Sequence, residues 1–161
     1  MTKIKLQIKN RWTGILIFEY EKENNTIKDA VLEALRVGAD LSNADLSNAK
    51  EVPYIPIACP TDGAFIGWKK VSFKLVKLEI PEDALRCSAT STKCRCSKAK
   101  VLAITEYDGS DPINAILNTN MVETWYKVGE MVYPDSFDED RWNECSHGIH
   151  FFINKEEAIN Y

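Results

Sequence analysis

The chain has 161 residues, 45% of them hydrophobic, and four tryptophans, which predicts one folded domain with at most a small appendage. The net charge of −4 gives no general attraction to duplex nucleic acid. No apolar run approaches the roughly 20 residues that cross a membrane, and an odd count of five cysteines fits a reducing compartment, so we expect a cytoplasmic protein.

The first fifty residues predict a β-hairpin and a helix. Residues 3–7 alternate polar and apolar side chains, and residues 15–20 are rich in β-branched and aromatic types, with Gly14 in the intervening turn. Thr26 is a candidate N-cap, apolar residues then recur at helical spacing, and Gly38 marks the helix end. Residues 39–49 follow as two copies of Ala-Asp-Leu-Ser-Asn, whose Ala and Leu side chains are expected to face inward.

The rest of the chain predicts a β-rich unit over residues 51–161, so the expected class is α+β with a boundary near residue 50. Prolines 53, 56 and 60 mark a connector, and residues 60–63 and 81–84 read as turns. Asn154 and the acidic residues after it predict a short C-terminal helix. Strands are expected at residues 64–68, 71–80, 100–107, 124–128, 131–133 and 149–153.

The whole chain resembles a phage and bacterial family of pentapeptide-repeat proteins with an uncharacterised C-terminal domain. The resemblance implies a phage or prophage setting, a solenoid reduced to two repeat units, and a C-terminal domain that carries the function. The residues that carry it are Lys3–Lys5, Arg11–Gly14, Phe18–Tyr20, Thr26–Lys28, the two repeat units, Ile57–Pro60, Phe65–Lys70, Leu78–Pro81, Cys94–Leu102, Tyr126–Glu130 and residues 141–152.

Charge is unevenly distributed along the C-terminal part. Residues 68–100 hold nine Lys or Arg and three Asp or Glu, a local net of +6, whereas residues 105–145 hold two and ten, a local net of −8. The two segments either neutralise each other across a shared sheet or form a basic floor and an acidic wall around an anionic ligand.

Residues 141–152 contain both histidines of the chain, together with Arg141, Trp142 and a cysteine. A zinc site is one interpretation, with Cys87, Cys94, Cys96 and Cys145 as ligands beside the histidines. Their spacings match no familiar zinc motif, so structural thiols are the preferred interpretation. His147 and His150 are also candidates for acid–base catalysis, against the alternative of histidines bonded within a turn around Gly148.

Anion recognition is the third interpretation of this part of the chain. Arginine and lysine side chains with neighbouring hydroxyls suit phosphate, and aromatic rings suit a base. A solvated basic loop is the alternative. The candidate ligand-binding residues are Arg86, Arg95, Lys98, Lys100, Trp68, Tyr126, Arg141, Trp142 and His150.

These patterns lead to three hypotheses of function. The first is a phage protein that sequesters an anionic, nucleotide-like small molecule, such as a host immune signal, without a cofactor. The second is a nucleotide-processing enzyme that uses His147 or His150. The third is a protein–protein inhibitor or structural module that binds through the hairpin edge or the repeat units. A homo-oligomer with a shared ligand site is compatible with all three.

Overall fold

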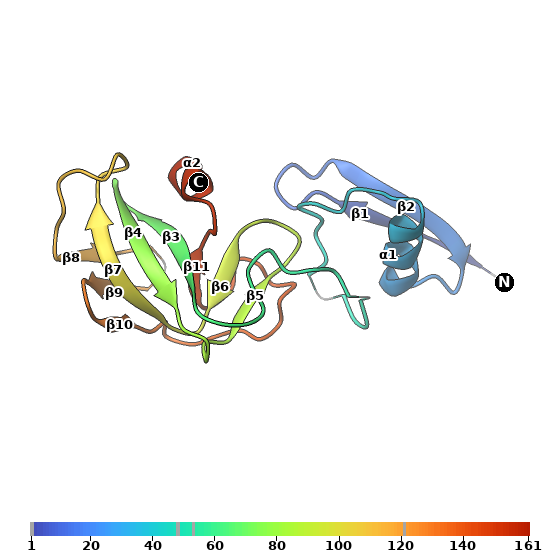
Figure 1. Ribbon diagram of the computed structural model, residues 1–161. Helices are drawn as coiled ribbons and strands as arrows, with labels where there is room; N and C mark the ends of the chain where they lie inside the picture. Colours follow the sequence, from blue (N-terminus) through green and yellow to red (C-terminus); the bar gives the residue numbers. More distant parts are fainter. Residues whose placement is uncertain (1, 48, 53, 121) are drawn as a thin grey trace.

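The computed structural model describes residues 2–47, 49–52, 54–120 and 122–161. A hairpin and a helix form one part, and several small antiparallel sheets form the other, with the two parts side by side (Figure 1). The β-rich α+β class is confirmed, whereas the division at residue 50 stays a prediction. In the part of the chain that the structure describes, no helix is long and apolar enough to cross a membrane.

The N-terminal part packs one helix against a two-stranded sheet. Strands β1 (Lys3–Lys9) and β2 (Leu16–Glu23) pair antiparallel, and α1 (Ile27–Arg36) follows. Thr26 caps α1 by accepting a bond from the Asp29 amide, and the Asp29 carboxylate accepts one from the Thr26 amide. The helix buries Ala30, Val31 and Ala34 in the cluster that includes Ile8 of β1.

The two repeat units lie along this cluster. Leu41, Ala44 and Leu46 are buried in it, whereas Asp40 and Asp45 are exposed and each accepts a bond from an amide two residues later. The inward side chains are those that the repeat pattern predicted. Residues 39–47 form turns and one bridge to the hairpin, not a coil of strands; Asn48 and Pro53 lie outside the described residues.

The C-terminal part contains three small antiparallel sheets. The first has the order β10-β7-β4-β3, the second β11-β6-β5, and the third pairs β8 with β9. Helix α2 (Lys155–Asn160) begins after the Asn154 cap and contacts β3. The strands are β3 (Phe65–Val71), β4 (Lys74–Ile80), β5 (Arg86–Ser88), β6 (Cys94–Cys96), β7 (Ala99–Thr105), β8 (Ala115–Asn118), β9 (Thr124–Lys127), β10 (Met131–Val132) and β11 (Ile149–Phe151).

A pair of backbone hydrogen bonds joins the first two sheets at their edges. Trp68 N donates to Phe152 O at 2.7 Å, and Phe152 N donates to Trp68 O at 2.8 Å. Gly67 permits this approach, because a Cβ atom at that position would lie 2.6 Å from the ring of Phe151. β3 and β11 therefore lie side by side, which brings the C-terminal segment to the face of β3 (Figure 1).

Two predictions about strands were wrong. Residues 71–80 do not form one strand, because Ser72 adopts a φ of 53° and turns the chain between β3 and β4. The basic segment of residues 86–100 contains two strands, β5 and β6, which were not predicted; a solvated loop was the alternative to anion recognition there. Both faces of β6 are buried, including Arg95, so this strand has no polar and apolar alternation.

Candidate functional site

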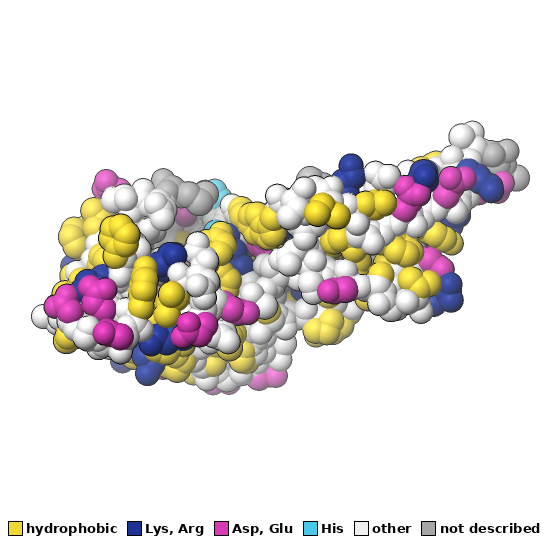
Figure 2. Space-filling view, turned by 90° about the horizontal axis from the view of Figure 1, so that it is seen from above, with side chains coloured by type: hydrophobic (Ala, Val, Ile, Leu, Met, Phe, Trp, Pro, Cys, Tyr) yellow, Lys and Arg dark blue, Asp and Glu magenta, His cyan; other side chains and the backbone are white. Residues whose placement is uncertain are grey.

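A cavity of about 460 Å³ opens in the C-terminal part. Side chains from β3, from the β8–β9 hairpin, from residues 134–150 and from the C-terminal end line it. Figure 2 views the molecule from above and shows histidine atoms, in cyan, beside a hollow on this face. The volume falls within the range of roughly 300–1,000 Å³ that is typical of small-molecule sites.

One wall of the cavity is basic. Lys69 and Lys70 of β3 and Lys93, which directly precedes β6, all line it. The Lys93 side chain is buried, with its residue only 4% exposed. Among the described residues, none of the three lysines lies within ion-pair distance of a carboxylate. The wall therefore carries positive charge that described acids leave uncompensated.

Lys93 is the most constrained of these lysines. Its Nζ donates to the Tyr161 hydroxyl at 2.8 Å and lies 3.5 Å from the Cys145 sulfur. The ammonium also lies 4.9 Å from the centre of the Tyr161 ring, a cation–π distance. Neutral partners and an aromatic face thus hold the ammonium at the cavity wall without cancelling its charge.

The buried, positively charged surroundings also change the pKa of Lys69. Burial, and then the positive charge of Lys93, lower the pKa of Lys69 from 10.5 to about 8. Lys69 keeps some solvent-accessible surface, because its side chain faces the cavity. An anion bound between these two ammonium groups would favour the charged form of Lys69 and hold both lysines by charge-assisted bonds.

His150 of β11 lies in the same wall as a neutral acceptor. Its Nε2 donates to the Ser146 carbonyl at 2.8 Å, which leaves Nδ1 without a proton in the neutral ring. Burial, followed by the charge of Lys93, lowers the pKa of His150 from 6.5 to about 4. The imidazole is therefore uncharged at neutral pH, and its free nitrogen accepts a hydrogen bond.

The low pKa of His150 makes the fold sensitive to acid. The unfolded chain takes up a proton at pH 6.5 and the folded chain near pH 4, so stability falls as the pH drops through this window. We expect His150 to account for a loss of about 3 kcal/mol between pH 7 and pH 4 in urea unfolding. A His150→Gln variant should lose much of this slope and the exposed His147→Gln control should keep it; equal slopes would contradict the assignment.

The side chain of His147 is held by the carboxylate of Asp135. Its Nδ1 lies 2.8 Å from Asp135 Oδ2, and both residues line the cavity. Gly148 follows with a φ of 138°, and a Cβ there would lie 3.3 Å from both Arg95 and Phe137. The interpretation of a tight turn around Gly148 is thus supported, and the turn brings both histidines to one cavity.

Aromatic and amide side chains complete the lining. Tyr126 of β9 is buried, and burial raises the pKa of its hydroxyl, so the phenol stays protonated at neutral pH. Phe152 and Tyr161 pack with ring centres 5.1 Å apart. Asn118 and Asn120 add amide groups at the rim of the cavity. The site thus combines positive charge with rings and neutral donors and acceptors.

The structure brings only part of the predicted site together. Of the candidate ligand-binding residues, Tyr126 and His150 line the cavity and Trp142 lines a neighbouring hollow. Lys98 forms an ion pair with Asp83 at 2.6 Å, Lys100 is exposed on β7, and Trp68 packs with Phe152 and Leu75. Arg86, Arg95 and Arg141 lie outside the lining of both hollows.

The three arginines instead bind backbone carbonyl groups. Arg95 is 2% exposed and donates to the carbonyls of Asp138, Asp140 and His147 at 2.6–2.9 Å. Arg86 donates to the carbonyls of Gly63, Pro81, Glu82 and Ala84. Arg141 donates to those of Ile55, Ser88 and Ala89. Their forked donors hold loops together, a role that the sequence pattern did not distinguish from anion binding.

The cysteines are placed for packing. Cys87, Cys94 and Cys96 are buried, and burial raises the pKa of Cys87 and of Cys96, which disfavours the thiolate that a metal requires. Cys145 is exposed at the cavity rim. No cluster of three or more His, Cys, Asp or Glu able to hold a metal ion occurs among the described residues.

Two cavity residues escaped the sequence interpretation. Lys69 and Lys70 fall between the strands predicted at residues 64–68 and 71–80, whereas β3 runs through both of them. The available signal was a pair of lysines next to otherwise apolar strand residues. Lys93, the third lysine of the wall, lies among the basic residues considered for anion recognition but is not one of the candidate ligand-binding residues.

Comparison with known proteins gives one match. Residues 55–158 match a family of unknown function, DUF5758. The chain belongs to this family. The match covers the sheets of the C-terminal part and most of the cavity lining, and it includes neither the β1–β2 sheet nor the two repeat units, so the expected relationship to pentapeptide-repeat proteins is not supported by it. No curated protein and no solved structure matches the chain significantly.

Proposed function

We propose that this DUF5758 domain binds a small anionic molecule, of the nucleotide class, in the cavity between β3, β11 and the β8–β9 hairpin. The observation that carries the proposal is the basic wall of Lys69, Lys70 and Lys93, on which described carboxylates form no ion pairs. A buried ammonium without a counter-charge is unfavourable. A phosphate between these lysines would supply that charge and accept their hydrogen bonds.

The remaining lining supports a nucleotide-like ligand over a bare anion. The cavity has room for more than one phosphate-sized group, at about 460 Å³. Tyr126 and Phe152 offer apolar ring surface, and His150 offers a neutral acceptor nitrogen. In the phage setting that the sequence resemblance implies, the function would be sequestration of a nucleotide signal of the host.

Isothermal titration with a panel of phosphate compounds tests the proposal. The panel contains inorganic phosphate, ribose 5-phosphate, AMP, ADP-ribose and cyclic dinucleotides. We expect Lys93→Met to lower the affinity of the best binder by about 10- to 100-fold, because the variant loses a charged hydrogen-bond donor while it keeps an unbranched side chain only one atom shorter. Binding to the wild type should also weaken between pH 7 and pH 9, since Lys69 has a pKa of about 8.

Lys98→Met is the matched control. Lys98 belongs to the same basic tract but pairs with Asp83 outside the cavity, so its removal should change the affinity less than twofold. The proposal fails if no compound of the panel binds to the wild type, or if the two variants lose affinity equally.

A reaction at the same cavity is the second candidate function. It is favoured by the pair of His147 and Asp135 in the lining, because a carboxylate on Nδ1 orients an imidazole for proton transfer at its other nitrogen. Mass spectrometry of the bound nucleotide separates the two functions. Recovery of unchanged nucleotide favours binding alone, whereas a product that disappears in His147→Gln favours catalysis.

A further inference from the structure

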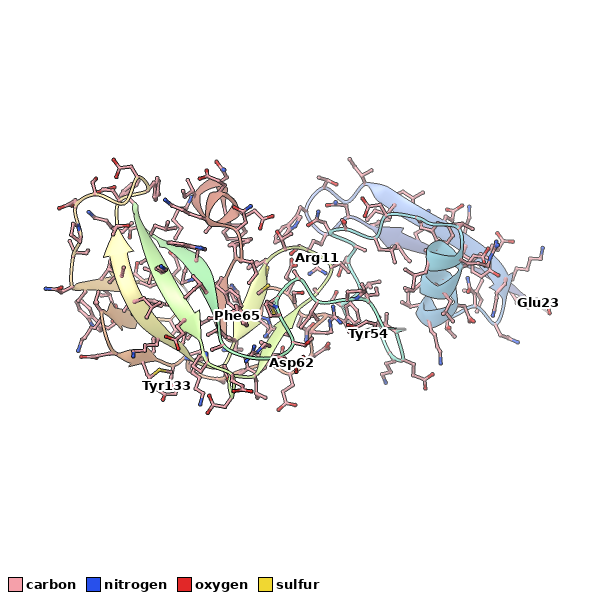
Figure 3. All side chains as sticks on the ribbon, in the orientation of Figure 1. Arg11, Glu23, Tyr54, Asp62, Phe65 and Tyr133 are labelled. Atoms are coloured by element: carbon pink, nitrogen blue, oxygen red, sulfur yellow. The ribbon has the colours of Figure 1, made fainter. Side chains whose placement is uncertain are left out.

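A second, more open hollow of about 380 Å³ adjoins the cavity. Cys145 and Ser146 line both, so a single short segment forms their common wall. The second hollow lies where the two parts of the chain meet, because its other residues come from the β1–β2 turn, the repeat units and residues 142–144. Figure 3 labels Arg11 at this junction.

The two hollows differ in their chemistry. The second hollow lacks the lysines of the first and is lined by two indole rings, Trp12 and Trp142, with the exposed acidic residue Asp45; Arg11 and Glu144, which also line it, are largely buried and pair with each other. Trp12 is 52% exposed, and the Arg141 guanidinium stacks over the Trp142 ring at 4.5 Å. Carboxylates repel a phosphate and accept hydrogen bonds from hydroxyl and amino groups, and indole rings stack with a planar base.

Lys93 connects the two hollows. Its Nζ lies 5.9 Å from the centre of the Trp12 ring and 4.9 Å from that of Tyr161, which lines the first cavity. The ammonium that is best placed to bind a phosphate is therefore also next to the ring that is best placed to stack with a base. One ammonium thus lies within about 6 Å of the centre of an aromatic ring of each hollow.

We propose that the two hollows form one composite site, with phosphate on the basic wall of the cavity and the nucleoside in the second hollow against Trp12. This inference rests on the proposed function and adds the orientation of the ligand. It also assigns a role to the N-terminal part, because Trp12 in the β1–β2 turn would complete a site built mostly on the DUF5758 domain.

Titration of Trp12→Ala with AMP, GMP, ribose 5-phosphate and inorganic phosphate tests the composite site. We expect a loss of about tenfold for the nucleotides, which is typical of a lost base–aromatic stack, and less than a twofold change for the two compounds without a base. Trp12→Phe should retain most of the nucleotide affinity. Trp125→Ala is the matched control, because Trp125 of β9 is 57% exposed and lines neither hollow.

The outcomes separate the two proposals. If phosphate compounds bind the wild type and Lys93→Met removes binding, but Trp12→Ala affects nucleotides and ribose 5-phosphate equally or not at all, the composite site is wrong and the anion site stands. If neither nucleotides nor base-free phosphates bind the wild type, both proposals fail.

Discussion

Replacement of Arg95 by alanine is expected to lower the free energy of unfolding by about 3–5 kcal/mol, because it removes a buried group and its charge-assisted hydrogen bonds to the backbone. The Arg95 guanidinium is buried and donates to three carbonyls of residues 138–147. It also lies 5.6 Å from the centre of the Phe137 ring. Removal of the guanidinium leaves these carbonyl groups without their donor.

Urea unfolding of Arg95→Ala measures this loss, and Lys98→Ala is its control. Lys98 forms only a surface pair with Asp83, whose side chain is 74% exposed, so its removal should cost at most about 1 kcal/mol. Arg95→Lys should recover little of the stability, because a single ammonium cannot replace the guanidinium fork. Equal stabilities of Arg95→Ala and Lys98→Ala would show that Arg95 does not hold the loop.

Removal of the Glu144 carboxylate is expected to lower the free energy of unfolding by about 3–5 kcal/mol, because it leaves a buried arginine without its counter-charge. Glu144 Oε2 lies 3.3 Å from Arg11 Nη1, and their side chains are 0% and 9% exposed. The other carboxylate oxygen accepts a hydrogen bond from the Ser91 hydroxyl. Arg11, labelled in Figure 3, belongs to the β1–β2 turn, and Glu144 belongs to the segment 141–152 that contains both histidines. The pair therefore joins the two parts of the molecule.

A double-mutant cycle of Arg11→Ala and Glu144→Ala tests the pair. The two losses should be non-additive, because the second substitution removes the charge that the first left unpaired; a coupling of about 1–3 kcal/mol is expected. The exposed pair of Lys28 and Glu51 provides the comparison, with a coupling below about 1 kcal/mol. Additive losses at Arg11 and Glu144 would mean that the junction does not depend on their contact.

The features that the sequence predicted correctly are those that depend only on residues adjacent in the chain. The N-caps of both helices, Thr26 and Asn154, were identified correctly, since a cap needs only its own first turn. The strand that contains Cys94 and Cys96 was missed, because all three of its residues are buried, so both of its faces lack exposed positions. Local alternation of polar and apolar residues is absent from such a strand.

The candidate site shows the same difference between features set by adjacent residues and features set by contacts in the folded chain. The sequence correctly grouped His147 and His150 as neighbours, and the cavity contains both. Composition could not show which cations line the cavity, because Arg95 and Lys93 are both positively charged residues and lie two positions apart. The difference between them is the set of carbonyls that Arg95 reaches and Lys93 does not, and that set exists only in the folded chain.

The cavity described above joins parts of the chain that are far apart in sequence. Lys70 of its basic wall donates to the Ile159 carbonyl, 89 positions later, and β11 closes onto β3 through Trp68 and Phe152. Contacts of such high sequence separation form late in folding, since the intervening loop must close first. Under the proposed function, binding would require this closed arrangement, and a bound ligand should slow the opening of the C-terminal segment that native-state hydrogen exchange reports.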